Sequence, residues 1–92
     1  MPEDQKLLMV TISGPDRPGI TAALTQVLIK HNVEIVDIEQ ASLQKLLGLY
    51  FLLDFGDAIE SKDSVIKDLL FEASRLNLSL NFKLISPSEL EA

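Results

Sequence analysis

The sequence contains no cysteine and no tryptophan, and only one of its 92 residues is a tyrosine. The absence of cysteine excludes disulfide bonds and thiolate metal sites, and it fits a chain that stays in the reducing cytoplasm. No apolar run reaches the roughly 18 residues that a membrane-spanning helix needs. Residues 1–4 lack the basic start of a signal peptide. We therefore expect a soluble cytoplasmic protein with no membrane partner.

Basic residues are also scarce, because eight lysines and arginines stand against fourteen aspartates and glutamates, for a formal net charge of −6. The phosphate backbone would repel such a chain, so nucleic acid is not an expected partner. Apolar residues, in contrast, are abundant at 47%, which is typical of a folded globular domain. We predict a single domain over 1–92, with a core over about 6–85 and a polar, unstructured tail over 86–92.

Hydrophobic periodicity predicts six elements. Apolar runs, alternating or continuous, predict four strands, over 6–13, 33–44, 47–55 and 78–84. Stripes with a spacing of three and four residues predict two helices, one beginning at Pro18 and one beginning after Ser61 as the N-cap. A change of phase near residues 35–36 indicates a β-bulge, and we expect a tight turn at Lys45 and Leu46.

The order βαββαβ is that of the split βαβ arrangement. Right-handed crossovers place both helices on one face of a four-stranded antiparallel sheet, with the apolar first and third strands in the centre and the acidic second strand at an edge. We therefore predict a ferredoxin-like α+β fold. The side chains expected to pack on the sheet or to form the buried face of the last strand are Ile20, Ala23, Leu24, Val27, Leu28, Ile66, Leu69, Leu70, Ala73, Leu76, Leu78, Leu80, Phe82 and Leu84.

Two features of this fold predict self-association. The sheet face opposite the helices would carry aliphatic side chains from the first and third strands, and a small monomer rarely exposes many of these. The second strand would also have a free edge for pairing. We expect a homodimer or a larger assembly.

Most chemistries that the fold can host lack their residues in this chain. Residues 14–19 have the glycine spacing of a phosphate-binding P-loop, but the lysine that must follow is replaced by Ile20. Asp54 and Asp57 are three positions apart, so they do not form the Asp-x-Asp pair of phosphoryl transfer. We interpret His31, the only histidine, as a compensating charge at a helix end. We expect no metal, no cofactor and no catalysis by this chain alone.

The turn over residues 13–20 is the best candidate for a binding site. Pro15 and Pro18 restrict the backbone on either side of Asp16 and Arg17. The N–H groups at the start of the following helix, from Gly19 to Thr21, have no partner within the helix and favour a small anion such as a carboxylate.

Two carboxylates could complete this site for an amino acid. We expect Glu34, at the start of the second strand, to lie near the turn, so that Asp16 or Glu34 could hold an ammonium group beside the bound carboxylate. The alternative is that Asp16 only forms the turn and starts the helix. Asp37 and Glu39 are most simply the solvated side of an edge strand.

Two segments, residues 14–20 and 31–40, resemble the ACT domain, a βαββαβ module that binds amino acids and regulates metabolic enzymes. The resemblance spans residues 7 to about 85. The turn Gly-x-Asp-x-Pro-Gly-Ile-Thr over 14–21, followed by Val-Glu-Ile-x-x-Ile-x-Gln over 33–40, is most similar to the N-terminal regulatory region of bacterial phosphoserine phosphatases. Formyltetrahydrofolate deformylases and glycine-cleavage regulators share the turn.

The resemblance implies a ligand site between two subunits, against the turn and the start of the second strand. By this resemblance the ligand-binding residues are Asp16, Arg17, Pro18, Gly19, Ile20, Glu34 and Ile35. Serine-binding relatives often carry amides where this chain has Asp16 and Glu34. The implied function is an amino-acid-sensing domain, with L-serine as the first candidate ligand and the catalytic domain of a phosphoserine phosphatase as partner. The alternatives are a dimerisation module that binds no ligand, or the ACT domain of a deformylase or a glycine-cleavage regulator.

Overall fold

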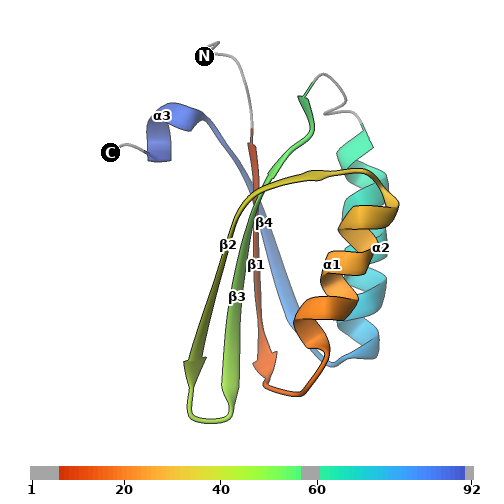
Figure 1. The fold of residues 1–92 in the computed structure, drawn as a ribbon, viewed down its shortest axis with the longest axis vertical. Coiled ribbons are helices and arrows are strands. Elements are labelled where there is room, and N and C mark those ends of the chain that lie inside the picture. The colour runs from red at the N-terminus through yellow and green to blue at the C-terminus, as the bar shows by residue number, and fades with distance from the viewer. Residues whose placement is uncertain (1–6, 57–60, 91–92) are drawn as a thin grey trace.

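A four-stranded antiparallel sheet, covered on one face by two helices, forms the body of the computed structural model, which describes residues 7–56 and 61–90 (Figure 1). The elements are β1 (Leu7–Pro15), α1 (Ile20–Lys30), β2 (Glu34–Leu43), β3 (Leu46–Asp54), α2 (Lys62–Arg75), β4 (Ser79–Ile85) and α3 (Pro87–Leu90). The strand order β2-β3-β1-β4 puts β1 and β3 in the centre. The predicted ferredoxin-like fold is confirmed.

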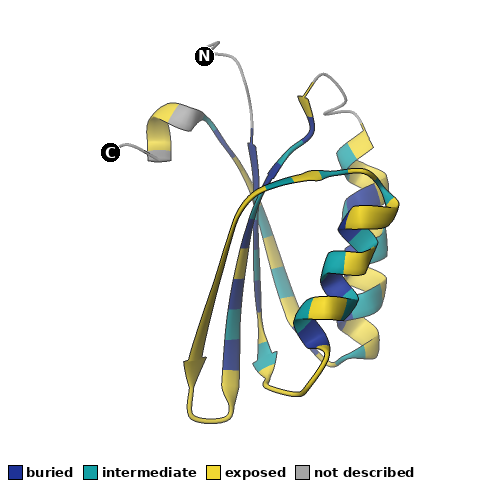
Figure 2. Cartoon of the chain, viewed as in Figure 1, coloured by how far each residue is buried: buried dark blue, intermediate teal, exposed yellow. Residues whose placement is uncertain are grey.

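The core lies between the sheet and the two helices (Figure 2). Alternate residues of the central strands point toward the helices, and those with apolar side chains, from Leu8 to Ile12 and from Leu47 to Leu53, are at most 2% exposed. They face one another in the cross-strand pairs Leu8 with Leu53, Val10 with Phe51, and Ile12 with Leu49. The helices add Ile20, Leu24 and Leu28 from α1 and Val65, Leu69 and Ala73 from α2. This packing is the physical basis for the position of both helices.

The buried face of α2 differs from the predicted stripe. Leu70 is 46% exposed, because the residues that meet the sheet are spaced four apart from Val65 to Ala73 and Leu70 lies beside that row. Ser61 precedes the helix as predicted, but its side chain does not cap the first turn. In β4, Leu84 is 43% exposed and not buried as predicted, since it lies on an edge strand that has a neighbour on one side only.

Helix α1 starts two residues later than the sequence predicts. The ladder of β1 continues as far as Pro15, which pairs with Leu46. Pro18 and Gly19 then form a turn, and the helix begins at Ile20. Gly19 has a φ of 88°, a left-handed conformation that cannot belong to the helix and that favours glycine.

The predicted bulge in β2 is confirmed by a register shift between Ile35 and Asp37. The tight turn that joins β2 to β3 consists of Gln44 and Lys45, one position earlier than predicted. Gln44 takes the left-handed conformation, with a φ of 56°. Leu46 belongs to β3, because it pairs with both neighbouring strands.

The tail is partly structured, contrary to the prediction. Residues 87–90 form α3, which lies on the side of the sheet away from α1 and α2 (Figure 1). The N–H of Glu89 donates to the carbonyl of Ser86 at 3.0 Å, which closes this single turn. The predicted strand start at Lys6, the loop over 57–60 and the end of the tail at 91–92 lie outside the described residues.

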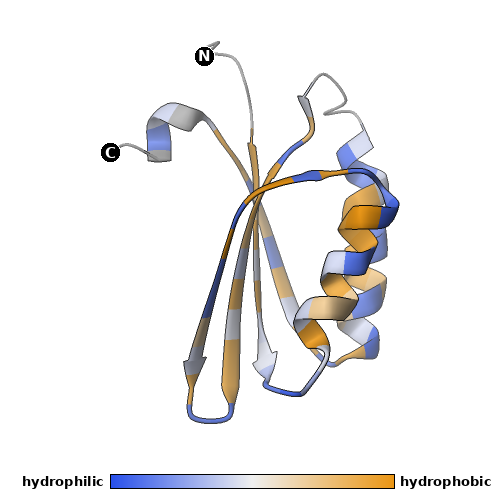
Figure 3. Ribbon diagram, viewed as in Figure 1, coloured by the Kyte–Doolittle hydropathy of each residue, from blue (hydrophilic) through white to orange (hydrophobic). Residues whose placement is uncertain are grey.

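The strands carry both apolar and polar residues (Figure 3), and the sheet face opposite α1 and α2, called the open face below, receives both kinds. In each strand, the residues that alternate with the buried core residues have their side chains on the open face. As predicted, aliphatic side chains of β1 and β3 are among them, including Met9 and Leu52, which are half-buried, and Leu46, which is exposed. Its edge at β2 is exposed almost throughout.

Candidate functional site

The turn over residues 16–19 is held from two sides. The N–H of Asp16 donates to the carbonyl of Lys45, at 2.8 Å, in the turn between β2 and β3. The guanidinium of Arg17 donates through Nη2 to the carbonyl of Leu76, at the C-terminal end of α2. A cation is favourable there, because the helix dipole is negative at that end. The turn therefore bridges a hairpin and a helix end, which gives it a defined shape.

The N-terminus of α1 opens onto this turn. The N–H of Ala23 donates to the carbonyl of Gly19 at 2.9 Å, which is the first bond of the helical ladder. No side chain caps the helix. The N–H groups of Ile20, Thr21 and Ala22 therefore point out of the positive end of the dipole, together with that of Gly19. The sequence predicts free N–H groups from Gly19 to Thr21. Because the helix starts at Ile20, the N–H of Ala22 is free as well.

The side chain of Thr21 ties this end of the helix to the sheet. Its Oγ1 donates to Oε1 of Gln40 in β2 at 3.1 Å. Gln40 is the last residue of the segment that resembles known ACT domains, and the sequence alone indicates no role for it. The contact links the start of α1 to β2 next to the turn.

Gly14 lets the turn approach the connection between α2 and β4. A Cβ atom at position 14 would lie 2.6 Å from Cδ2 of Leu78 and 3.3 Å from the carbonyl oxygen of Asn77. At Gly19, in contrast, an added Cβ would meet no atom within 4 Å, so only the backbone angle favours glycine there. Gly14 thus sets the close contact, and Gly19 sets the turn.

Glu34 and Ile35 do not lie near this turn. They pair with Asp54 and Leu53, at the end of the sheet opposite to Leu46, which pairs with Pro15 just before the turn. Leu46 and Asp54 are eight positions apart in β3, or about 26 Å at ~3.3 Å per residue. The expectation that Asp16 and Glu34 flank one crevice is therefore wrong for a single chain. The reason is that α1, 11 residues long, carries the chain along the sheet before β2 begins.

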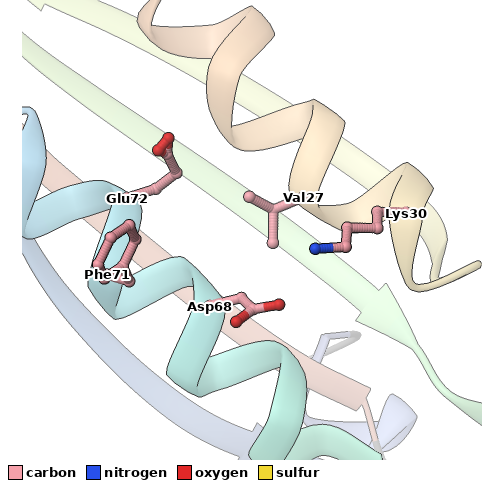
Figure 4. Close-up of a pocket in the computed structure, with 5 residues that line it drawn as sticks. All are labelled: Val27, Lys30, Asp68, Phe71 and Glu72. Carbon is pink, nitrogen blue, oxygen red and sulfur yellow. The ribbon is translucent and has the colours of Figure 1, made fainter.

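A second polar feature lies between the two helices. Nε2 of His31, at the end of α1, and Oδ2 of Asp68, in α2, are 2.6 Å apart. Their pair borders a groove that is lined by Val27, Lys30, Asp68, Phe71 and Glu72 (Figure 4). No local pattern signals this pairing, because the two residues are 37 positions apart. The sequence alone indicates for His31 only a compensation of the helix dipole.

The pair predicts a pH dependence of stability. The hydrogen bond with His31 lowers the pKa of Asp68 below its ordinary value. A depressed carboxyl pKa stabilises the fold above the unfolded pKa of about 3.9, and this stabilisation is lost as the pH falls through the folded value. We expect the free energy of unfolding of the wild type, minus that of Asp68→Asn, to decrease as the pH falls below about 4.

Urea unfolding between neutral pH and acid measures this difference. Asp63→Asn is the control, because it removes one negative charge from the same helix at a side chain that is 83% exposed and that pairs with Lys62, at 3.5 Å, and not with a histidine. If the difference between wild type and Asp68→Asn stays constant with pH, the contact with His31 does not stabilise the ionised carboxylate.

Other kinds of site have little support in residues 7–56 and 61–90. These residues contain no group of three or more histidine, aspartate or glutamate side chains placed to hold a metal ion. In the same described ranges, no helix combines the length and the apolar character that crossing a membrane requires.

Comparison with known protein sequences identifies the family to which this chain is similar. The model of the ACT domain family matches residues 6–83. A UPF0237 protein of Pyrobaculum aerophilum is 36% identical over 73 residues, which cover 79% of this chain and 81% of that protein. The phosphoserine phosphatase of Mycobacterium tuberculosis is 37% identical over 62 residues, which cover 63% of this chain but 15% of the phosphatase.

Solved structures agree with this fold. An ACT domain protein from Streptococcus pneumoniae has a TM-score of 0.74 and 20% identity, over 97% of this chain and 98% of that one. A formyltetrahydrofolate deformylase from Burkholderia mallei also has a TM-score of 0.74, with 15% identity, over 84% of this chain and 27% of the deformylase. At these identities the likeness extends to the fold and not to the ligand.

Proposed function

We propose that this chain, which belongs to the ACT domain family, binds a small amino acid at the turn before α1 and thereby regulates a metabolic enzyme. ACT domains are regulatory modules. The observation that carries the proposal is the uncapped N-terminus of α1, which opens onto a turn held by Lys45 and Leu76. L-serine is the first candidate, because phosphoserine phosphatases, which release serine, are among the relatives.

Each residue of the turn has a proposed role. The carboxylate of the ligand would accept hydrogen bonds from the N–H groups of Gly19 and Ile20, where the helix dipole favours an anion. Pro18 has no N–H to donate and restricts the turn. The ammonium group would lie toward Asp16, since charge-assisted hydrogen bonds are strong. Arg17 would act indirectly, because its guanidinium is engaged by the end of α2.

Glu34 and Ile35 would join this site only from a second copy of the chain. β2 lies at an edge of the sheet and has one side free for pairing. Antiparallel pairing of β2 with β2 of a second copy would bring the start of one strand beside the end of the other. The end of β2 adjoins Lys45, which contacts Asp16. A dimer of this kind agrees with the site between subunits that the resemblance implies.

The regulated enzyme is proposed to be a phosphoserine phosphatase, whose catalysis would reside in a separate domain. The match that covers 81% of the small Pyrobaculum protein favours a second candidate, a regulator that binds its enzyme without a covalent link. Both candidates use the same amino-acid site.

Titration with L-serine, glycine, L-alanine and L-threonine tests the amino-acid site, with D-serine as the stereochemical control. At a tenfold excess over its dissociation constant, a ligand that binds only the folded state adds about 1.4 kcal/mol of stability. For a domain of this size, each kcal/mol raises the melting temperature by about 4–8 °C. Calorimetry measures the binding, and thermal unfolding measures the shift.

Asp16→Asn should weaken binding of the same ligand, while Asp63→Asn, on the exposed side of α2, should leave it unchanged. If no amino acid produces heat or a shift in melting temperature, ligand binding is excluded, and the chain is better described as a dimerisation module.

A further inference from the structure

The groove between α1 and α2 has the dimensions of a site for a small ligand. It has a volume of about 440 Å³ and is lined by Val27, Lys30, Asp68, Phe71 and Glu72 (Figure 4). Small-molecule sites commonly have volumes of about 300–1,000 Å³ and combine apolar walls with a few polar groups. Here the apolar wall consists of Val27 and Phe71, and the polar groups are one ammonium group and two carboxylates.

The aromatic ring in this wall is open to solvent. Phe71 is 72% exposed and does not belong to the core between the sheet and the helices. Val27, which is half-buried, borders the same groove from α1 (Figure 4). An apolar group that covers the ring would remove both surfaces from water, and aromatic side chains contribute strongly to binding in this way.

Two opposite charges beside this wall are available to a ligand. The side chains of Lys30, the last residue of α1, and Asp68, in α2, extend toward each other across the groove (Figure 4). Lys30 forms no ion pair with any residue in the described ranges 7–56 and 61–90. Asp68 contacts His31 through Oδ2, so its Oδ1 remains for a second donor.

The charge of the third polar side chain is already matched within the chain. The carboxylate of Glu72 accepts hydrogen bonds from Nε and Nη2 of Arg75, at 3.0 and 2.9 Å. Lys30 and Asp68 therefore decide which ligand fits. A ligand with only a carboxylate would be attracted by Lys30 but repelled by Asp68, and a ligand with only an ammonium group would meet the reverse. A ligand that carries both groups is attracted by both side chains.

We infer that the groove binds a small zwitterion with an apolar side chain, such as an apolar α-amino acid. Its carboxylate contacts Nζ of Lys30, and its ammonium group contacts Oδ1 of Asp68. Its side chain covers Phe71 and Val27. This site is separate from the turn before α1, because Ile20 and Lys30 are ten positions apart along the helix, or about 15 Å. Either site can fail without the other.

Titration with L-phenylalanine, followed by the amide signals in NMR spectra, tests the inference. The measurement is made at about pH 7.5, where imidazole groups carry little charge. The amides of α1 and α2 near Val27 and Phe71 should shift. Phenylpropionate lacks the ammonium group and phenethylamine lacks the carboxylate, so each should bind about fivefold more weakly, the upper range for an exposed ion pair. Shifts confined to the turn over 16–19 would assign the ligand to the site proposed above and overturn this inference.

Two variants of exposed residues locate the ligand within the groove. Lys30→Gln should raise the dissociation constant of L-phenylalanine about fivefold, and Phe71→Ala should raise it about tenfold. Lys83→Gln is the matched control, because it removes the same charge from an exposed residue of β4 on the open face, and it should have no effect. Circular dichroism should show that all three variants are folded.

Three results would overturn the inference. The first is an absence of shifts in α1 and α2 at about 10 mM L-phenylalanine, a concentration that reveals sites with millimolar dissociation constants. The second is equal binding of L-phenylalanine and its two singly charged analogues, since the opposite charges of the groove would then not select the ligand. The third is unchanged binding by both Lys30→Gln and Phe71→Ala.

Discussion

Phe51→Ala should lower the free energy of unfolding by about 3–5 kcal/mol. Phe51 lies in the middle of β3, is 1% exposed and is among the largest fully buried side chains. It pairs with Val10 in β1 and with Ile38 in β2, so its removal leaves a cavity between the sheet and the helices. Because small domains have total stabilities of about 5–15 kcal/mol, this loss would leave a substantial unfolded population.

Phe71→Ala is the control for the same change of side chain. Phe71 lies in α2 and is 72% exposed. We expect its loss to change the free energy of unfolding by no more than about 0.5 kcal/mol, which is usual for surface positions. Urea unfolding of both variants, monitored by circular dichroism, separates the effect of burial from that of residue type. Equal costs would contradict the position of the core between the sheet and the two helices.

Gly14→Ala should destabilise the protein by about 1–3 kcal/mol, the usual cost of inserting an atom into a packed site. The new Cβ would lie 2.6 Å from Cδ2 of Leu78, whose side chain is buried and has little room to move. The backbone at Asn77 would also have to shift, because its carbonyl oxygen would be only 3.3 Å away. The connection that moves also carries Leu76, which holds Arg17. The variant should therefore weaken amino-acid binding as well.

Gly48→Ala is the matched control in the neighbouring central strand. Its Cβ would meet the side chain of Tyr50 at 3.7 Å, an ordinary van der Waals distance. An alanine that fits without strain reduces the entropy of the unfolded chain, so we expect stabilisation by about 0.4–1 kcal/mol. The two substitutions should thus have opposite signs in the same urea experiment. A neutral effect of Gly14→Ala would mean that Leu78 can move aside and that the approach is not tight.

The order and type of the main elements can be read from the sequence, because they follow from local spacing of side chains. Apolar residues with a period of two or of about 3.6 predict a strand or a helix wherever they occur. The change of phase near Ile35 predicts the bulge for the same reason, since one extra residue reverses the face of all that follow. Where local signals are weak, the predicted boundaries are wrong by one or two residues, as at Gly19 and Gln44.

The turn before α1 is also recognisable from the sequence, because two prolines and two glycines within it restrict the chain locally. The residues that contact the turn or lie near it in space cannot be recognised from the sequence. The length of α1 and the sheet register place Glu34 at the far end of β2, and packing of the helices brings Arg17 to Leu76 and His31 to Asp68. Likewise, only the packing of α1 beside α2 brings Lys30 and Phe71 to one groove. These relations join residues far apart in the chain, and no local period encodes the distance between them, so the tertiary structure alone decides them.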